Sequence, residues 1–184
     1  MKMNLQADVP AARRDIENEI RFAFTGVVLG DGTSIGHAEY IDCWGKNPDG
    51  SPITDEQYRA MTANDIVDDW TQVTLRELER DNIAHFDPAG FRYYLPALLL
   101  SLLDDYDPLS MRTIGTLSGL RLYLDDPPDR AAHRFSLLND AQKRAVARFL
   151  VLLPEIVELT TEDEKIVRQS LERYWSAFLQ QVSE

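Results

Sequence analysis

The stretch Leu95–Leu103 constrains the fold most strongly, because every side chain in it except Ser101 is apolar. A helix that is apolar on all sides has no face for water and must lie at the centre of a bundle. Pro96 suits the first turn of a helix, so we expect this helix to begin near Leu95. The run is about half as long as the ~20 residues that a membrane span needs. It therefore predicts a buried central helix and no membrane insertion.

Amphipathic helices are predicted on both sides of this centre. Apolar residues recur at helical spacing near the two ends of the chain, at Ile16, Ile20, Ala23, Phe24 and Val27 and again at Val167, Leu171, Tyr174, Phe178 and Val182. Capping signatures occur at Thr54 with Gln57, Thr74 with Glu77, Asn139, and Thr161 with Glu164. No succession of strand, helix and strand indicates a parallel sheet. We expect an all-α, single-domain bundle of about six to eight helices around the central apolar helix, with residues 1–184 as one helical domain.

Some segments carry more specific expectations. The spacing of Ile35, Ala38, Ile41 and Trp44 predicts that all four side chains face inward on a short helix capped by Thr33 or Ser34. Apolar spacing also predicts a helix over 64–72, and the capping signature of Thr74 with Glu77 predicts another over 75–83. Residues 110–124 are ambiguous: Met111, Ile114, Leu117 and Leu120 have helical spacing, whereas Leu120, Leu122 and Leu124 alternate as in an extended segment. Both alternatives stay open.

The net charge of −12 on 184 residues argues against a nucleic-acid partner, because phosphate contacts are made by lysine and arginine. The charge is uneven: Pro108–Leu150 carries seven basic and four acidic residues, hence +3, and the remainder carries −15. This basic island, Arg112 to Arg148, could meet an acidic partner or neutralise the protein's own acidic helices; we favour the second. The single cysteine, Cys43, allows no internal disulfide, and the N-terminal residues lack the apolar run of a signal peptide. We expect a cytoplasmic protein.

No residue pattern indicates catalysis, a metal or a cofactor. His37, His85 and His133 lie in three separate regions, and none has the spacing of a helical metal motif. Cys43 could act as a nucleophile served by His37, but a structural thiol explains it more simply. We therefore predict no catalytic residues, no metal ligands and no cofactor, and lean away from an enzyme.

The best candidate for a binding site is the aromatic and charged segment before the central helix. We predict binding residues His85, Asp87, Arg92 and Tyr93, because ligands often bind near helix starts and Arg and Tyr are enriched in interface hot spots. The structural alternative is that Arg92 pairs with Asp87 and that the tyrosines fill the edge of the core. The sequence leaves both open.

Three sequence strings together resemble one known family. They are Trp-Thr-Gln-Val-Thr-Leu-Arg-Glu-Leu (70–78), Asp-Pro-Ala-Gly-Phe-Arg-Tyr-Tyr-Leu-Pro-Ala (87–97) and Arg-Phe-Ser-Leu-Leu-Asn-Asp-Ala-Gln-Lys-Arg-Ala-Val-Ala-Arg-Phe-Leu (134–150). The chain is similar, from about Gly30 to Leu153, to a family of bacterial proteins described only as a domain of unknown function, with the last helix outside the resemblance. The resemblance implies a small helical bacterial domain and assigns no functional residue.

Two functional hypotheses from different classes follow. The first is a non-enzymatic, cytoplasmic protein-interaction module that binds a basic protein partner, of which a toxin-neutralising, immunity-like role is one version. The second is a metal-dependent hydrolase or small-molecule-binding protein that uses Asp104, Asp105 and Asp107 with Asp125, Asp126 and a histidine. The oligomeric state is left open.

Overall fold

A computed structural model describes residues 9–80, 83–122 and 133–179 of the chain, and the regular elements of this part are helices. It contains eight α-helices: α1 (Val9–Ala23), α2 (Ile35–Asp42), α3 (Asp55–Thr62), α4 (Leu75–Leu78), α5 (Pro88–Asp104), α6 (Met111–Leu120), α8 (Asp140–Ile156) and α9 (Thr161–Arg173). Three short 3-10 helices accompany them: η2 (Trp70–Gln72), η3 (Ile83–His85) and η4 (Trp175–Phe178). The one extended pairing among the described residues is an isolated bridge between Lys46 and Pro52. The predicted all-α, single-domain fold is confirmed.

The α5 helix is the buried centre that the sequence predicts, since 13 of its 17 residues are buried. Its predicted start near Leu95 is wrong, because the helix begins at Pro88, with Asp87 as its N-cap. Pro88 takes the first-turn position that we assigned to Pro96, so Pro96 lies inside the helix instead. Pro96 has no N–H to donate to the carbonyl four residues earlier, and dense packing on both sides of the helix holds it in place.

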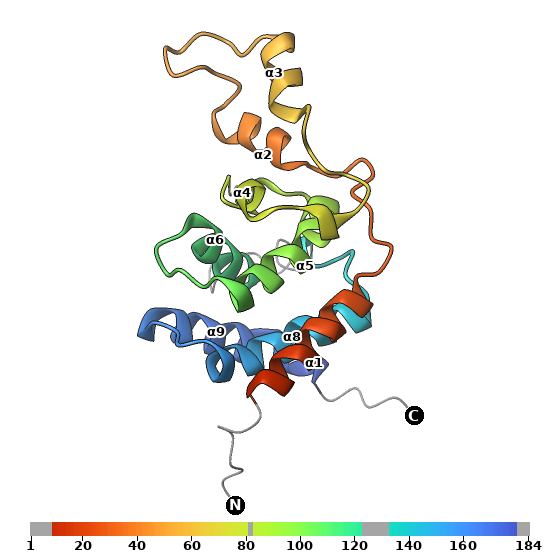
Figure 1. Cartoon of the computed structure of the whole chain (residues 1–184). Coiled ribbons are helices and arrows are strands. Elements are labelled where there is room, and N and C mark those ends of the chain that lie inside the picture. Colours follow the sequence, from red (N-terminus) through yellow and green to blue (C-terminus); the bar gives the residue numbers. More distant parts are fainter. Residues whose placement is uncertain (1–8, 81–82, 123–132, 180–184) are drawn as a thin grey trace, which may run out of the picture.

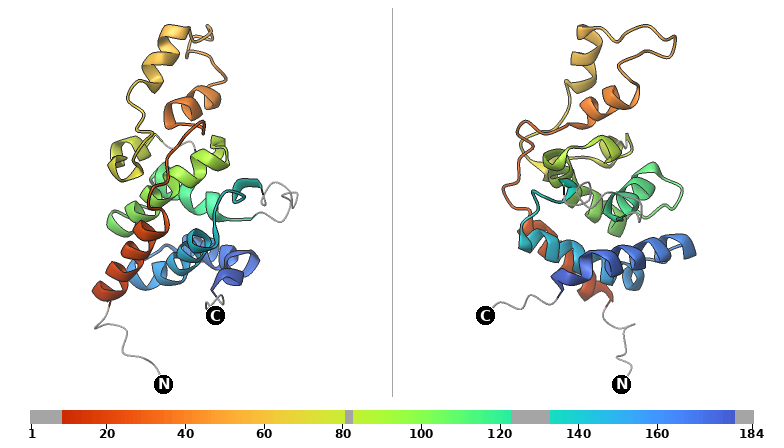
Figure 2. Two further views of the ribbon diagram at one scale, coloured as in Figure 1. Left: turned by 90° about the vertical axis from the view of Figure 1, so that its right-hand side faces the viewer. Right: turned by 180° about the vertical axis from the view of Figure 1, so that it is seen from behind.

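The elements form three tiers along the molecule (Figure 1). At one end α1, α8 and α9 lie together, α5 and α6 lie in the middle with α4, and α2 and α3 lie at the other end. The views in Figure 2 show the same order from the side and from behind. Helix α1 packs mainly along α8 and also contacts the central helix α5. An ion pair of 2.6 Å between Arg148 of α8 and Glu19 of α1 joins the two helices on their outer side.

The tier of α2 and α3 projects from the core and is attached to it by polar contacts and by the buried side chain of Ile35. No residue of α3 is buried. Arg80 pairs with Glu39 of α2, and the hydroxyl of Tyr94 in α5 accepts a hydrogen bond of 3.3 Å from the Ile35 N–H. We call α2, α3 and the segment between them, residues 35–62, the arm.

Two predictions for the arm and its connection to the core are wrong. Ile35 and Ala38 of α2 are buried as expected, but Ile41 and Trp44 are exposed, because none of the described elements covers that side of the helix. The predicted helix over 64–72 does not form; only Trp70–Gln72 is helical, as η2. Trp70 is nevertheless buried, and its indole N–H donates a hydrogen bond of 2.9 Å to the carbonyl of Phe24.

Other predicted helices form with different limits. The helix expected over 75–83 ends at Leu78. Residues 111–120 are helical, which settles the ambiguity at 110–124 up to Leu122; Leu124 lies outside the described residues. Helix α9 is capped by Thr160 rather than Thr161 and ends at Arg173, so Tyr174 and Phe178 lie beyond it. Val182, the last residue of the predicted stripe, is outside the described residues. Among the described helices, none is long and apolar enough to cross a membrane.

Candidate functional site

The four predicted binding residues lie close together in sequence but have different surroundings. His85 ends η3, Asp87 caps α5, and Arg92 and Tyr93 lie within the first turns of α5. His85 and Asp87 share one shallow surface depression with His133 and Arg134, whereas Arg92 and Tyr93 do not line it. The structure therefore brings together two of the four residues and separates the other two from them.

Asp87 stabilises the fold locally. Its Oδ1 accepts hydrogen bonds from the Gly90 N–H at 2.7 Å and from the Thr33 N–H at 3.0 Å, so it both caps α5 and fixes the loop before α2. Gly90 is required for this approach, because a Cβ there would lie 2.4 Å from the Thr33 carbonyl oxygen. The Asp87 carboxylate is engaged by backbone N–H groups, and no ion pair with Arg92 is formed among the described residues.

Tyr93 is a core residue. Its side chain is fully buried, and burial, followed by the charges of Asp69 and Asp68, raises the pKa of its hydroxyl above the ordinary value. The neighbouring Tyr94 is also buried, and its ring lies edge-on to that of Tyr93 at 4.9 Å. Of our two alternatives for the tyrosines, filling the core describes their position.

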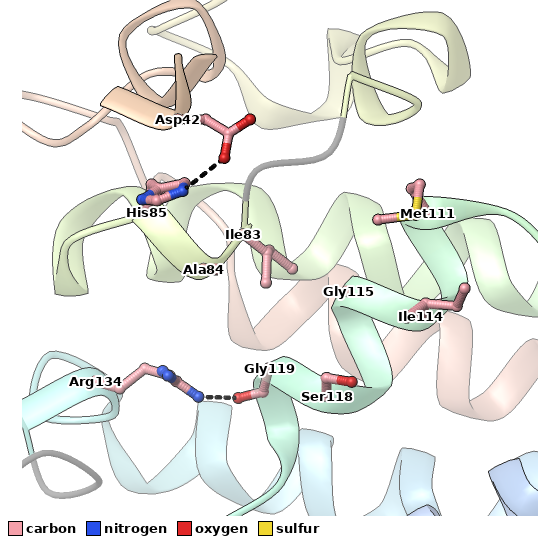
Figure 3. Close-up of a pocket in the computed structure, with 10 residues that line it drawn as sticks. All are labelled: Asp42, Ile83, Ala84, His85, Met111, Ile114, Gly115, Ser118, Gly119 and Arg134. Atoms are coloured by element: carbon pink, nitrogen blue, oxygen red, sulfur yellow. Dashed lines mark hydrogen bonds and ion pairs between the residues drawn. The ribbon is translucent and has the colours of Figure 1, made fainter. Parts of the chain in front are cut away.

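His85 contacts the arm. Its Nε2 lies 3.1 Å from Oδ1 of Asp42, at the C-terminal end of α2. This contact spans 43 positions in sequence and closes one rim of a groove that His85 also lines (Figure 3). The groove is the second surface that involves a predicted binding residue.

The groove lies between η3 and α6 and has a volume of about 370 Å³. Its wall is mostly apolar and is made by Ile83, Ala84, Met111, Ile114, Gly115 and Gly119, with Ser118 beside them. Polar groups lie at its two edges, the Asp42–His85 pair at one and Arg134 at the other (Figure 3). Arg134 donates a hydrogen bond of 3.1 Å to the carbonyl of Gly119, so this arginine is bound to the wall itself.

Sequence reasoning missed this groove. We noted the helical spacing of Met111 and Ile114, which did not indicate that their side chains are exposed. In the structure Met111 is 58% and Ile114 is 42% exposed, and Gly119 lets η3 approach, because a Cβ there would lie 3.1 Å from Ile83 Cγ2. The signal that could have revealed the face is the i, i+3, i+4 spacing of Met111, Ile114 and Gly115, which places them on one side of α6.

The aspartates of the hydrolase hypothesis have other partners. Asp104 pairs with Arg13, Asp105 pairs with Arg112 at 3.1 Å, and Asp107 accepts a hydrogen bond of 2.9 Å from the Leu109 N–H. Asp125 and Asp126 lie outside the described residues. Within the described ranges, no group of three or more His, Cys, Asp or Glu side chains is placed to hold a metal ion.

The basic island is not one surface. Arg112 is buried and pairs with Glu79 and Asp105, while Arg148 pairs with Glu19. The ammonium group of Lys143 lies 5.3 Å from the centre of the Phe178 ring. We gave two explanations for the basic island. Arg112 and Arg148 fit the second, since each neutralises acidic groups of this chain.

Comparison with known proteins identifies the family of this chain. Residues 12–179 match a family described as "Family of unknown function (DUF6714)". The chain belongs to this family. The match extends beyond the sequence resemblance noted above: it includes α9, so the last helix is part of the family's shared region rather than outside it. No curated protein and no solved structure matches the chain. The groove between η3 and α6 lies wholly within the DUF6714 region.

Proposed function

We propose that this protein is a non-enzymatic protein-interaction module, and that the groove between η3 and α6 receives an apolar side chain of a basic protein partner. The observation that carries the proposal is the exposed apolar wall of the groove, formed by Met111 and Ile114. Single exposed apolar residues are ordinary on protein surfaces, but a concave apolar wall with polar edges is typical of a binding site. Leu109, just before α6, is 86% exposed and extends the apolar surface beyond the groove.

Charge favours a basic partner. The chain carries a net charge of −12, which attracts positively charged proteins and slows the approach of acidic ones. At the groove itself, Asp42 has an exposed carboxylate whose Oδ1 contacts His85. A basic residue next to the inserted apolar side chain could pair with this carboxylate. A cytoplasmic, immunity-like role in a bacterium is one concrete version of the proposal.

A matched pair of crosslinking positions tests the proposal. Ile114 and Val151 have nearly equal exposure, 42% and 44%, but Ile114 lines the groove and Val151 lies on α8. A photo-crosslinking amino acid is placed at each position in turn, in cells of the source organism. We expect one discrete protein adduct from position 114, lost when Met111→Glu is added and reduced at high salt, and no such adduct from position 151.

The contrary results are equally definite. The absence of an adduct at position 114, or the same adducts from both positions, would contradict a docking site in the groove. Turnover in a broad hydrolase screen that depends on an added divalent metal would favour the metal-dependent alternative.

A further inference from the structure

The largest exposed apolar side chain of the arm is Trp44, which follows α2. It is 87% exposed, whereas Trp70 and Trp175 are buried. Burial of an aromatic side chain of this size would stabilise the fold. Because the indole of Trp44 stays in water, it does not contribute this stabilisation. Tryptophan is also among the residues most enriched in interface hot spots.

The backbone of Trp44 is unusual as well. It is the only residue other than glycine with a positive φ in the described part of the chain, at 58°. The hydrogen bonds identify Trp44 as the left-handed residue that follows Cys43, the C-cap of α2: the Trp44 N–H donates to the Ile41 carbonyl at 3.0 Å, and the Gly45 N–H donates to the Tyr40 carbonyl at 3.0 Å. This position usually holds glycine, because the left-handed conformation is sterically unfavourable for a residue with a Cβ. The fold therefore tolerates strain at a residue that it does not pack.

The turn that carries Trp44 is well supported. Gly45 also has a positive φ, of 63°, and lies so close to Tyr40 that a Cβ at residue 45 would be 2.8 Å from its hydroxyl oxygen. The Ile53 N–H donates a hydrogen bond of 2.8 Å to the Gly45 carbonyl, and the rings of Tyr40 and Tyr58 meet edge-on at 5.0 Å. These contacts fix the backbone on the C-terminal side of Trp44, so the exposed indole is presented from an ordered turn.

The surroundings of Trp44 are negatively charged. Residues 31–80 contain eleven acidic and four basic residues, a net charge of −7. The last turn of α2 contains no basic residue, although the helix dipole favours a cation at this end. Glu39 and Asp42 lie near it and contact Arg80 and His85, and Lys46 is the nearest basic residue in sequence. A cation brought by another molecule would improve the electrostatics at this helix end.

We propose that Trp44 anchors the arm to a cationic segment of a partner protein, with an arginine or lysine side chain packed on the indole face. A cation over an aromatic ring is attracted by the ring's negative face, most strongly for tryptophan, and the surrounding carboxylates add to this attraction. A second copy of this chain is disfavoured because it would bring an equally acidic arm to the contact. The inference rests on the proposed function, since it names the chemistry of the partner that the module binds.

The probe is an acetylated, amidated tetra-arginine peptide added to the full-length protein, with NMR detection of the three tryptophan indole N–H signals. We expect the Trp44 signal, assigned through Trp44→Phe, to shift on titration while the signals of buried Trp70 and Trp175 stay in place. Trp44→Gly should weaken peptide binding by about fivefold or more, and Trp44→Phe should retain most of the affinity, because it keeps an aromatic face.

Thermal unfolding separates this role from a structural one. Glycine suits the left-handed backbone conformation of residue 44, and little packing is lost with the exposed indole. Trp44→Gly should therefore leave the unfolding midpoint unchanged or raise it. A fall of several degrees would show that Trp44 supports the fold and would overturn the inference. Failure of the wild type to bind the peptide, or equal binding by Trp44→Gly, would also overturn it.

Crosslinking at position 114 tests the groove and does not depend on the peptide titration or on thermal unfolding. An adduct there together with equal peptide binding by Trp44→Gly would leave the groove proposal standing and remove only the role of Trp44. No adduct together with a weakened Trp44→Gly variant would remove the groove and keep the arm.

Discussion

Leu98 and Leu102 lie one helical turn apart on α5, and both are buried as the sequence predicts, at 3% and 0% exposure. A leucine cut to alanine at such a site loses apolar contacts and leaves a cavity that neighbours fill only in part. We expect Leu98→Ala to lower the free energy of unfolding by about 2–5 kcal/mol, a large part of the ~5–15 kcal/mol typical of a domain. Urea denaturation measures the change.

The control for this prediction is Val151→Ala on α8. Val151 is exposed, so its truncation should change the free energy of unfolding by about 0.5 kcal/mol or less. Equal losses from the two variants would contradict the central position of α5.

Apolar spacing predicted which side chains share a helix face, but not whether another element covers that face. Ile35 and Ala38 are buried because α2 contacts the rest of the fold on their side, whereas Trp44 follows the same spacing and remains in water. Met111 and Ile114 also have helical spacing, and they line an open groove. The covering elements lie far away in the sequence, so no local pattern contains this information.

Helix starts were predicted better than helix ends. The capping boxes of Thr54 with Gln57 and of Thr74 with Glu77 form as expected, because a cap depends only on residues within one turn. The end of α4 at Leu78 was missed, although the four residues that follow, Glu79 to Asn82, are all polar and do not continue an apolar face. Asp87 and Pro88 carried a readable start signal for α5, and the prediction failed by choosing Pro96 instead.

Arg112 joins three elements from a buried position. Its side chain is 1% exposed and contacts Glu79 after α4 at 3.0 Å, the carboxylate of Asp105 at 3.1 Å and the carbonyl of Ser101 in α5 at 3.1 Å. Sequence analysis counted it only as part of a basic island, because burial of an arginine depends on partners that the fold supplies.

Replacing Arg112 by methionine should weaken the contacts that join α4, α5 and α6. The change keeps most of the side-chain volume but removes the hydrogen bonds to the carboxylates of Glu79 and Asp105 and to the backbone carbonyls of Ser101 and Asp105. We expect a loss of about 2–3 kcal/mol in the free energy of unfolding, measured by urea denaturation. Arg148→Met is the control: its partner Glu19 lies on the surface, so its loss should cost about 0–1 kcal/mol. A similar cost for both arginines would contradict the structural role of Arg112.

On the scale of the whole molecule, the sequence predicted the fold class and its centre but not the arrangement of the tiers. The groove combines α2, η3, α6 and Arg134, and the contact between Asp42 and His85 alone spans 43 positions. Of the four predicted binding residues, His85 lines this groove, while Asp87 caps α5 and Tyr93 lies in the core. Closeness to a helix start in the sequence identified the region of the groove. It could not tell which of the side chains there are buried in the fold and which are exposed.

The tyrosines of the core make the whole fold sensitive to alkaline pH. The pKa values of Tyr93, Tyr94, Tyr106 and Tyr174 are all raised, with burial as the first cause in each, and the Asp163 carboxylate beside Tyr106 adds to the effect. In the unfolded chain a tyrosine ionises near pH 10. The folded state therefore holds these protons at a pH where the unfolded chain releases them.

The sign of the effect follows from this difference. Below about pH 9 the four tyrosines are neutral in both states, and their contribution to stability is fully present. Above about pH 10 only the unfolded chain ionises, so the free energy of unfolding falls as the pH rises, by up to about 1.4 kcal/mol per pH unit for each tyrosine. Urea denaturation in steps from about pH 8 to about pH 11 should show a plateau followed by this decline.

Tyr174→Phe tests the cause, because burial is the one source of the raised pKa at this residue and phenylalanine cannot ionise. The variant should unfold with a shallower decline above about pH 10, and an unchanged slope would show that tyrosine ionisation does not govern alkaline unfolding.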